Sequence, residues 1–197
     1  MTLILASKSI ARQNMLQAVN IHFESIPAEL DEDTLTENAK TQQNAPREIA
    51  LMLAQEKALA ISKQHSGRLV IGSDQVLGCD GEMLTKAVDQ KAAKEKLQFL
   101  RGKTHYLISA VSVVRDEDIL WSHTDAAALT MKDVSDEALD AYCEHAGEAL
   151  TRSVGAYEIE ALGARLFEKI EGDFFTVQGM PLLPLLQYLE DEQGLSL

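Results

Sequence analysis

An aspartate at the end of an apolar run is the side chain of this sequence best placed to do chemistry. The run 69–73 is typical of a buried strand, and Asp74 follows it directly. A carboxylate at the carboxyl end of a central strand faces the crevice in which α/β proteins bind ligands. With Glu32 it would offer the oxygen ligands that Mg²⁺ and Mn²⁺ prefer, and Lys86 would then neutralise phosphate charge. Turns also favour Asp, so an Asp74 that only caps a turn stays an alternative.

Anion binding is the chemistry that the N-terminal segment predicts. The apolar run 3–6 stops at Ser7, Lys8 and Ser9, and an amphipathic segment that carries Arg12 follows. A strand that leads into a helix N-terminus presents unpaired backbone N–H groups and a partial positive charge, which attract phosphate. The segment lacks the glycine pattern of a P-loop. Serines that cap a helix and an Arg12 that pairs with a surface acid are therefore the alternative.

Two further segments carry candidate polar groups. Lys57 falls on the apolar side of a predicted helix, where it either reaches solvent along its own stem or meets an anion in a cleft. The glycine-framed segment 155–163 contains Glu158 and Glu160, and Glu160 could accept hydrogen bonds from the amino or imino group of a base. A connector with two solvated glutamates is the alternative for that segment.

Strands and helices are expected to alternate along the chain, with one hairpin inserted. The acidic stretch from Pro27 to Asn44 has little apolar content and is expected to form a long functional loop. The pattern predicts an α/β fold with a mixed, twisted sheet flanked by helices. Expected strands are 3–6, 22–26, 69–73, 105–114, 119–131 and 166–170, and expected helices are 10–19, 47–64, 90–100, 136–145 and 182–189.

The composition of the chain limits the kinds of molecule that it is expected to bind. The net charge of −13 disfavours nucleic acid polymers and anionic membranes, so a polyanionic ligand would need a local cationic site or a metal. The two cysteines have no zinc-type spacing, which fits a reducing cytoplasm, and no apolar run is long enough to span a membrane. A cytoplasmic protein that binds a small anionic molecule is expected.

Several motifs, in order along almost the whole chain, resemble those of the Maf family of nucleoside triphosphate pyrophosphatases. The resemblance implies cleavage of a nucleoside triphosphate between its α and β phosphates, with a divalent metal, Mg²⁺ or Mn²⁺. It also implies a single domain over 1–197, an elongated two-lobed fold with a central cleft like that of the inosine triphosphate pyrophosphatases, and a homodimer. The motifs are Leu5-Ala6-Ser7-x-Ser9-x-x-Arg12, Gln55-Glu56-Lys57-Ala58, Ile71-Gly72-Ser73-Asp74-Gln75-Val76, Asp80-Gly81-Glu82, Gly102-Lys103-Thr104-His105, Gly155-Ala156-Tyr157, Glu171-Gly172-Asp173 and Gly179-Met180-Pro181-Leu182.

The resemblance also assigns roles to individual positions. Asp74 matches the catalytic proton acceptor, and Glu32 with Asp74 matches the metal site. The residues that match the phosphate site are Ser7, Arg12, Lys57 and Lys86.

In the family, three positions determine which base is accepted. They match Ala11, Gln75 and Glu160 of this chain. Gln75 with Glu160 resembles the 7-methyl-GTP branch, whereas Ala11 fits neither that branch nor the dTTP/UTP branch. A non-standard or methylated triphosphate is therefore the expected substrate. The chain departs from the usual family residues at Lys8, Ile10, Ala87 and Ala161.

A second function stays open. The family has been linked to the arrest of cell division at the septum. The chain could therefore be a nucleotide-sensing binding protein whose weak catalysis is incidental.

Overall fold

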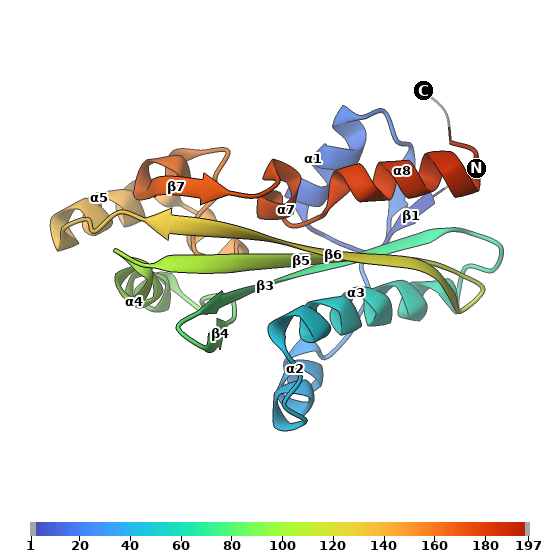
Figure 1. Cartoon of the computed structure of the whole chain (residues 1–197), viewed down its shortest axis with the longest axis horizontal. Helices are drawn as coiled ribbons and strands as arrows, with labels where there is room; N and C mark the ends of the chain where they lie inside the picture. The colour runs from blue at the N-terminus through green and yellow to red at the C-terminus, as the bar shows by residue number, and fades with distance from the viewer. Residues whose placement is uncertain (1–2, 196–197) are drawn as a thin grey trace. The chain divides into compact units, whose positions relative to one another are not determined.

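The computed structural model describes residues 3–195 and contains a seven-stranded mixed sheet flanked by helices (Figure 1). The path through the sheet is β2-β1-β3-β5-β6-β7, and β4 pairs with β3 beside that path. β1 runs parallel to β2 and β3, whereas β4 and β7 run antiparallel to β3 and β6. The predicted mixed α/β fold is therefore confirmed. The strands are β1 (Leu3–Leu5), β2 (Phe23–Ser25), β3 (Val70–Cys79), β4 (Glu82–Leu84), β5 (Thr104–Arg115), β6 (Asp118–Met131) and β7 (Phe167–Glu171).

The five expected helices lie close to where the sequence predicts them, whereas α2 and the short α6, η1 and α7 were not predicted. The stretch expected as a long acidic loop contains the helix α2, so that prediction was wrong. Asp31 caps this helix by accepting hydrogen bonds from both the backbone N–H and the hydroxyl of Thr34, and Glu32 and Asp33 complement the positive end of the helix dipole. The helices are α1 (Ile10–Ala18), α2 (Glu32–Thr41), α3 (Pro46–Ser62), α4 (Gln90–Leu100), α5 (Asp136–Ala146), α6 (Ala149–Arg152), a 3-10 turn η1 (Leu162–Leu166), α7 (Phe174–Gln178) and α8 (Leu182–Gln193).

The described chain divides into two compact units. Unit 1 is assembled from three separate stretches, which are Met1–Gln75, Ile108–Asp125 and Phe174–Leu197. Unit 2 consists of Val76–Leu107 and Ala126–Asp173. A single domain over 1–197 stays a prediction. Among residues 3–195, no helix is both long and apolar enough to cross a membrane.

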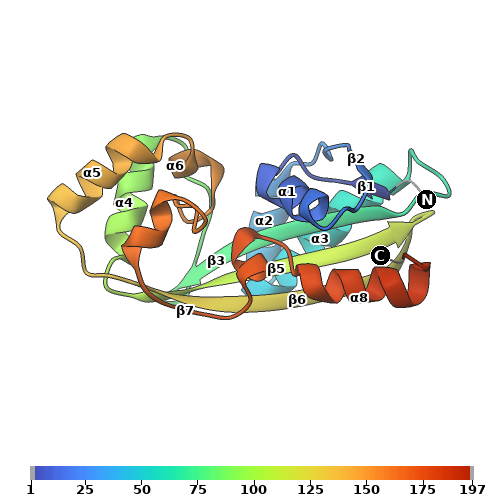
Figure 2. The same ribbon diagram turned by 90° about the horizontal axis from the view of Figure 1, so that it is seen from above.

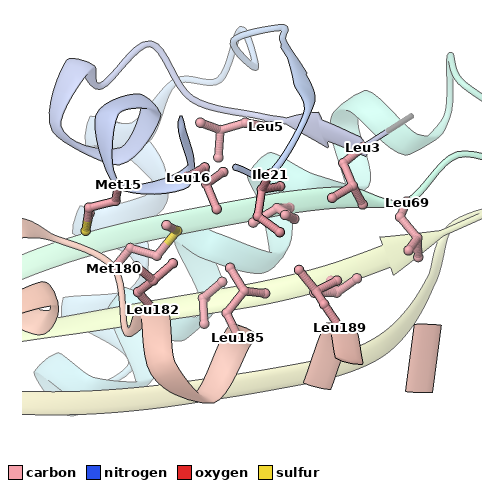
Figure 3. Close-up of a cluster of buried hydrophobic side chains, with 13 residues drawn as sticks. Leu3, Leu5, Met15, Leu16, Ile21, Leu69, Met180, Leu182, Leu185 and Leu189 are labelled. Atoms are coloured by element: carbon pink, nitrogen blue, oxygen red, sulfur yellow. The ribbon is translucent and has the colours of Figure 1, made fainter. Parts of the chain in front are cut away.

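Unit 1 covers both faces of its strands. Because successive strand residues point to opposite faces, Leu3 and Leu5 pack on one side of β1, and Ile4 packs on the other. The first side carries the leucines of α8 and Met15 and Leu16 of α1 (Figure 3). Burial on both faces explains why β1 and the start of β3 are continuously apolar.

On the other face, α3 approaches β3 unusually closely. A Cβ atom added at Gly72 would lie 2.1 Å from the carbonyl oxygen of Ala54 and 2.8 Å from the backbone nitrogen of Ala58. Only glycine leaves the helix backbone room at this point of the strand. α3 and α8 thus lie on opposite sides of the strands of unit 1 (Figure 1).

Unit 2 groups α4, α5 and α6 side by side (Figure 2). Its interior contains a polar pair, in which His105 Nε2 lies 2.6 Å from the hydroxyl of Tyr157. The ring of Phe167 packs against both of these side chains. Tyr157 lies in the glycine-framed segment 155–163, so this buried contact fixes one end of that segment.

Candidate functional site

A lysine and two carboxylates form the centre of the candidate site, and all three belong to unit 1. Lys57 Nζ lies 2.6 Å from Asp74 Oδ1 and 2.8 Å from Glu32 Oε2. Each side chain comes from a different element: α3 supplies Lys57, β3 supplies Asp74 and the first residue of α2 is Glu32. Residues that are distant in sequence therefore converge on one ammonium group.

The close packing of α3 on β3 explains this convergence. Gly72 and Asp74 point to the same face of β3, the face that α3 covers. Lys57 is one helical turn from Ala54 and adjacent to Ala58, the two residues that contact Gly72. The buried Lys57 side chain thus extends past the helix contact and ends at the carboxylates, which decides against the alternative that it only reaches solvent.

Asp74 has two oxygen atoms in different situations. Oδ1 accepts a hydrogen bond from Lys57. Oδ2 has no hydrogen-bond partner among residues 3–195, and it is not among the buried atoms that lack one, so it is accessible to solvent. The side chain as a whole is buried. A carboxylate with one oxygen anchored and the other open to a small molecule can accept a proton from water.

Arg12 lies beside this group rather than on the surface. Its Nε donates to the carbonyl oxygen of Gly179 at 2.9 Å, and its Nη1 donates to that of Ser73 at 2.7 Å. Burial lowers the pKa of Arg12 from its ordinary value, and the negative charges of Asp74 and Glu32 partly offset this effect. The alternative in which Arg12 pairs with a surface acid is therefore wrong. Nη2 has no hydrogen-bond partner among the described residues and is the donor that a ligand could use.

The two serines of the N-terminal loop have different tasks. Ser9 caps α1 by accepting a hydrogen bond from the backbone N–H of Arg12. Ser7 is buried, and its hydroxyl oxygen accepts from Ser9 N–H at 3.2 Å and from Arg12 Nη1 at 3.3 Å. The hydroxyl hydrogen of Ser7 is not needed for either contact and can be donated to an anion. Lys8 is exposed, as is Ile10.

Divalent metal binding can be tested against these contacts. Among the described residues there is no group of three or more His, Cys, Asp or Glu side chains that could hold a metal ion. Glu32 and Asp74 nevertheless place one oxygen each within 2.8 Å of the same cationic nitrogen. The cation that these two oxygens share is the Lys57 ammonium, and carboxylate is the donor type that Mg²⁺ and Mn²⁺ prefer. The pair fits such a metal if water or substrate supplies the remaining ligands.

The other predicted residues lie outside this group. Ala11 is half-buried on α1. Lys86 and Glu160 are exposed residues of unit 2, and their participation in the site stays a prediction. Glu158 is engaged locally, because its carboxylate accepts from Arg152 at 2.7 Å and 2.9 Å. Ala87 is buried and Ala161 is exposed.

Sequence reasoning missed five residues that support the site, one of which is Val177, whose carbonyl oxygen accepts from Gln75. Ser73 and Gly179 supply the carbonyl oxygens that orient Arg12, and Ser109 and Thr176 contact the side-chain amide of Gln75. Backbone carbonyls have no sequence signature. The one available signal was a serine within the apolar strand β5, where a buried hydroxyl requires a polar partner.

Comparison with known proteins gives a consistent result. A family model described as "Maf-like protein" matches residues 2–192. A nucleoside triphosphate pyrophosphatase of Paramagnetospirillum magneticum is 45% identical over 188 residues, which cover 95% of this chain and 97% of the relative. A protein of the same name from Nitrobacter hamburgensis is 44% identical over 195 residues and covers 99% of this chain and 96% of the relative. Among solved structures, the Staphylococcus aureus Ham1 protein matches 68% of this chain and 73% of its own at 12% identity, with a TM-score of 0.40.

Proposed function

The chain belongs to the Maf-like family, and on that premise we propose that it is a nucleoside triphosphate pyrophosphatase. This enzyme is a hydrolase that acts on an acid anhydride. It would cleave the bond between the α-phosphorus and the oxygen that bridges to the β-phosphorus, giving a nucleoside monophosphate and pyrophosphate. The observation that carries the proposal is the ion pair between Asp74 and the buried Lys57, which contacts one oxygen of Asp74 and leaves the other available.

Asp74 is the proposed general base. Its open oxygen, Oδ2, would accept a proton from a water molecule while the oxygen of that water attacks the α-phosphorus. The bridging oxygen leaves with the pyrophosphate. Lys57 holds the other oxygen of Asp74 at 2.6 Å, so the carboxylate is oriented before substrate arrives. Positioning and electrostatic stabilisation are the main contributions that a protein can make to such a reaction.

The phosphates would be held by donors of the N-terminal segment. Arg12 Nη2 and the Ser7 hydroxyl each have a hydrogen to donate, Lys8 adds an exposed ammonium, and Ser9 starts α1 beside them. The charges of Arg12, Lys57, Asp74 and Glu32 sum to zero, so these groups alone do not neutralise a triphosphate. Lys86 is therefore proposed as an additional cationic contact.

A divalent metal, Mg²⁺ or Mn²⁺, is proposed for the same reason. Glu32 and Asp74 would hold it, since both carboxylates lie beside Lys57 and carboxylate is the donor type that such an ion prefers. Once bound, such an ion would neutralise phosphate charge and stabilise the charge that develops on the leaving group. Lys57 would remain the group that fixes the orientation of the carboxylates.

Base choice is proposed to involve Ala11, Gln75 and Glu160, with a methylated or otherwise non-standard triphosphate as the preferred substrate. We also propose a cytoplasmic homodimer. The second candidate function is a nucleotide-sensing protein that acts in the arrest of cell division. That candidate predicts binding of nucleotides with little pyrophosphate release, which distinguishes it from the enzyme.

Pyrophosphate release by the Asp74→Asn variant tests the proposal. With Mg²⁺ or Mn²⁺ and a panel of standard and methylated triphosphates, the variant should lose about 10²- to 10⁴-fold in kcat, because the open oxygen can no longer take a proton efficiently. Its circular dichroism spectrum should match that of the unmodified protein. Asp116→Asn, at an exposed turn, is the matched control and should keep full turnover. Unchanged kcat in Asp74→Asn would overturn the assignment of the base.

A further inference from the structure

The side-chain amide of Gln75 is surrounded on its nitrogen side by hydrogen-bond acceptors. Nε2 lies 3.0 Å from Ser109 Oγ, 3.1 Å from the carbonyl oxygen of Thr176 and 3.0 Å from that of Val177. Ser109 is a buried residue of β5, and both carbonyls belong to α7. One amide nitrogen with two hydrogens thus serves three acceptors.

These contacts determine which way the amide faces. The hydroxyl of Ser109 donates its hydrogen to the carbonyl oxygen of Thr176 at 2.8 Å, so Ser109 Oγ can only accept from Gln75. A rotated amide would direct its oxygen at three groups that have no hydrogen to donate. The network therefore fixes the orientation of the Gln75 amide, with Nε2 directed toward Ser109 and the two α7 carbonyls.

The amide oxygen is left to face outward. Gln75 Oε1 has no hydrogen-bond partner among residues 3–195, and it is not one of the buried atoms that lack a partner. It therefore remains in contact with solvent. An oxygen held in this way can only accept, so a ligand that contacts it must donate a hydrogen.

Gly179 has no side chain, which leaves a position beside the Gln75 amide unfilled. A Cβ atom added there would lie 3.5 Å from Arg12 Nη2 and 3.8 Å from Gln75 Cδ, and the φ angle of +109° also disfavours any side chain. The empty position is bordered by a cationic donor on one side and the Gln75 amide on the other. A ligand that carries both a negative charge and a hydrogen-bond donor matches the two borders.

Gln75 is already proposed to take part in base choice. We propose that Ser109 and the α7 carbonyls of Thr176 and Val177 orient its amide, so that its oxygen accepts a hydrogen bond from a donor of the nucleoside. This inference rests on the proposed function, in which Arg12 binds phosphate. The donor is an N–H group of the base or a hydroxyl of the ribose. Ser109 acts through Gln75 and is a positioning residue.

The test compares triphosphates that differ in one donor. Inosine and uridine triphosphates each carry one base N–H, which their 1-methyl and 3-methyl derivatives lack, and 2′-deoxy and 3′-deoxy derivatives lack a ribose donor. We expect one of these losses to lower kcat/KM by about tenfold or more, because it leaves a fixed acceptor unpaired. Gln75→Met should remove that discrimination. Equal kcat/KM for all the derivatives would overturn the proposal.

Ser109→Ala tests the positioning role. The change should raise KM several-fold for the parent triphosphate and leave KM for the donor-blocked derivative unchanged, since only the parent uses the oriented oxygen. Ser112→Ala is the matched control, because Ser112 is also buried on β5 but donates to the carbonyl oxygen of Trp121. Equal effects of Ser109→Ala on both triphosphates would overturn the role.

Measuring nucleotide binding as well as turnover tests the role of Gln75 separately from the proposed pyrophosphatase activity. The Kd of the corresponding α,β-methylene triphosphates, which resist cleavage, is measured by calorimetry. Discrimination in Kd without any pyrophosphate release from hydrolysable substrates would refute the enzyme and leave the role of Gln75 intact. Pyrophosphate release without discrimination in either measurement would refute the role of Gln75 alone. Failure of every α,β-methylene triphosphate to bind would overturn both.

Discussion

Acid should destabilise this protein through one buried histidine. His105 is fully buried in unit 2, and burial lowers its pKa to about 4. In an unfolded chain the pKa of histidine is about 6.5. The unfolded state therefore takes up the proton first as the pH falls, so the free energy of unfolding decreases between about pH 6.5 and pH 4 and levels off below that range.

The size of the effect follows from the two pKa values. The full difference of about 2.5 units corresponds to about 3.4 kcal/mol. Between about pH 7.5 and pH 4.5, the contribution of this one residue falls by about 2.5 kcal/mol. The structure gives the physical reason: Nε2 is engaged with Tyr157, and Nδ1 is a buried atom that has no hydrogen-bond partner among the described residues. An imidazolium cation would bury an unpaired positive charge there.

Urea unfolding of the unmodified protein and of His105→Gln measures this contribution. Carboxylates titrate in the same range, but they are common to both proteins and cancel in the difference. The unmodified protein should lose about 2.5 kcal/mol more than the variant between about pH 7.5 and pH 4.5. His22→Gln, at an exposed histidine, is the matched control and should show the pH dependence of the unmodified protein. An identical pH dependence in His105→Gln and the unmodified protein would refute the reasoning.

Two further predictions concern packing and loop attachment. Gly72→Ala should lower the free energy of unfolding by more than about 2 kcal/mol, because its Cβ would collide with the backbone of α3, whereas Gly78→Ala on the same strand meets nothing closer than 4.0 Å and should cost far less. Similar urea midpoints for the two variants would contradict this account. Lys96→Met should cost about 1 to 3 kcal/mol in urea unfolding, because Lys96 Nζ donates to the carbonyl oxygens of Thr85 and Val154. Lys91→Met, on the exposed side of α4, should change stability by less than about 0.5 kcal/mol, and an equal loss in both lysine variants would show that the two carbonyl contacts are not the cause.

The sheet and most helices could be predicted because burial leaves a regular pattern in sequence. Apolar runs marked β1 and β3, and the Asp89 and Ser135 caps marked the starts of α4 and α5. Helix α2 was missed because only Thr36 and Ala39 on it are buried. Capping by Asp31 and the dipole support that helix instead of an apolar stripe.

The candidate site could be predicted only in part. Asp74, Lys57 and Glu32 were named from their chemistry, and the structure places Lys57 within hydrogen-bond distance of both carboxylates. The partners of Arg12 could not be predicted, because they are backbone carbonyls, one of them 167 residues away. Hydrogen bonds to the backbone depend on the path of the chain, which no residue type records.

The contact between Arg12 and Gly179 has a consequence for the synthesis of the protein. Arg12 leaves the ribosome well before Gly179 and α7, because Gly179 lies 167 residues further along the chain. Until then the guanidinium of Arg12 lacks one of its two carbonyl partners, and Gln75 lacks two of its three acceptors. A chain that ends before α7 therefore lacks both the acceptors of the site and the leucines of α8 that pack on β1. Synthesis of α7 and Gly179 therefore supplies the remaining partners of both side chains.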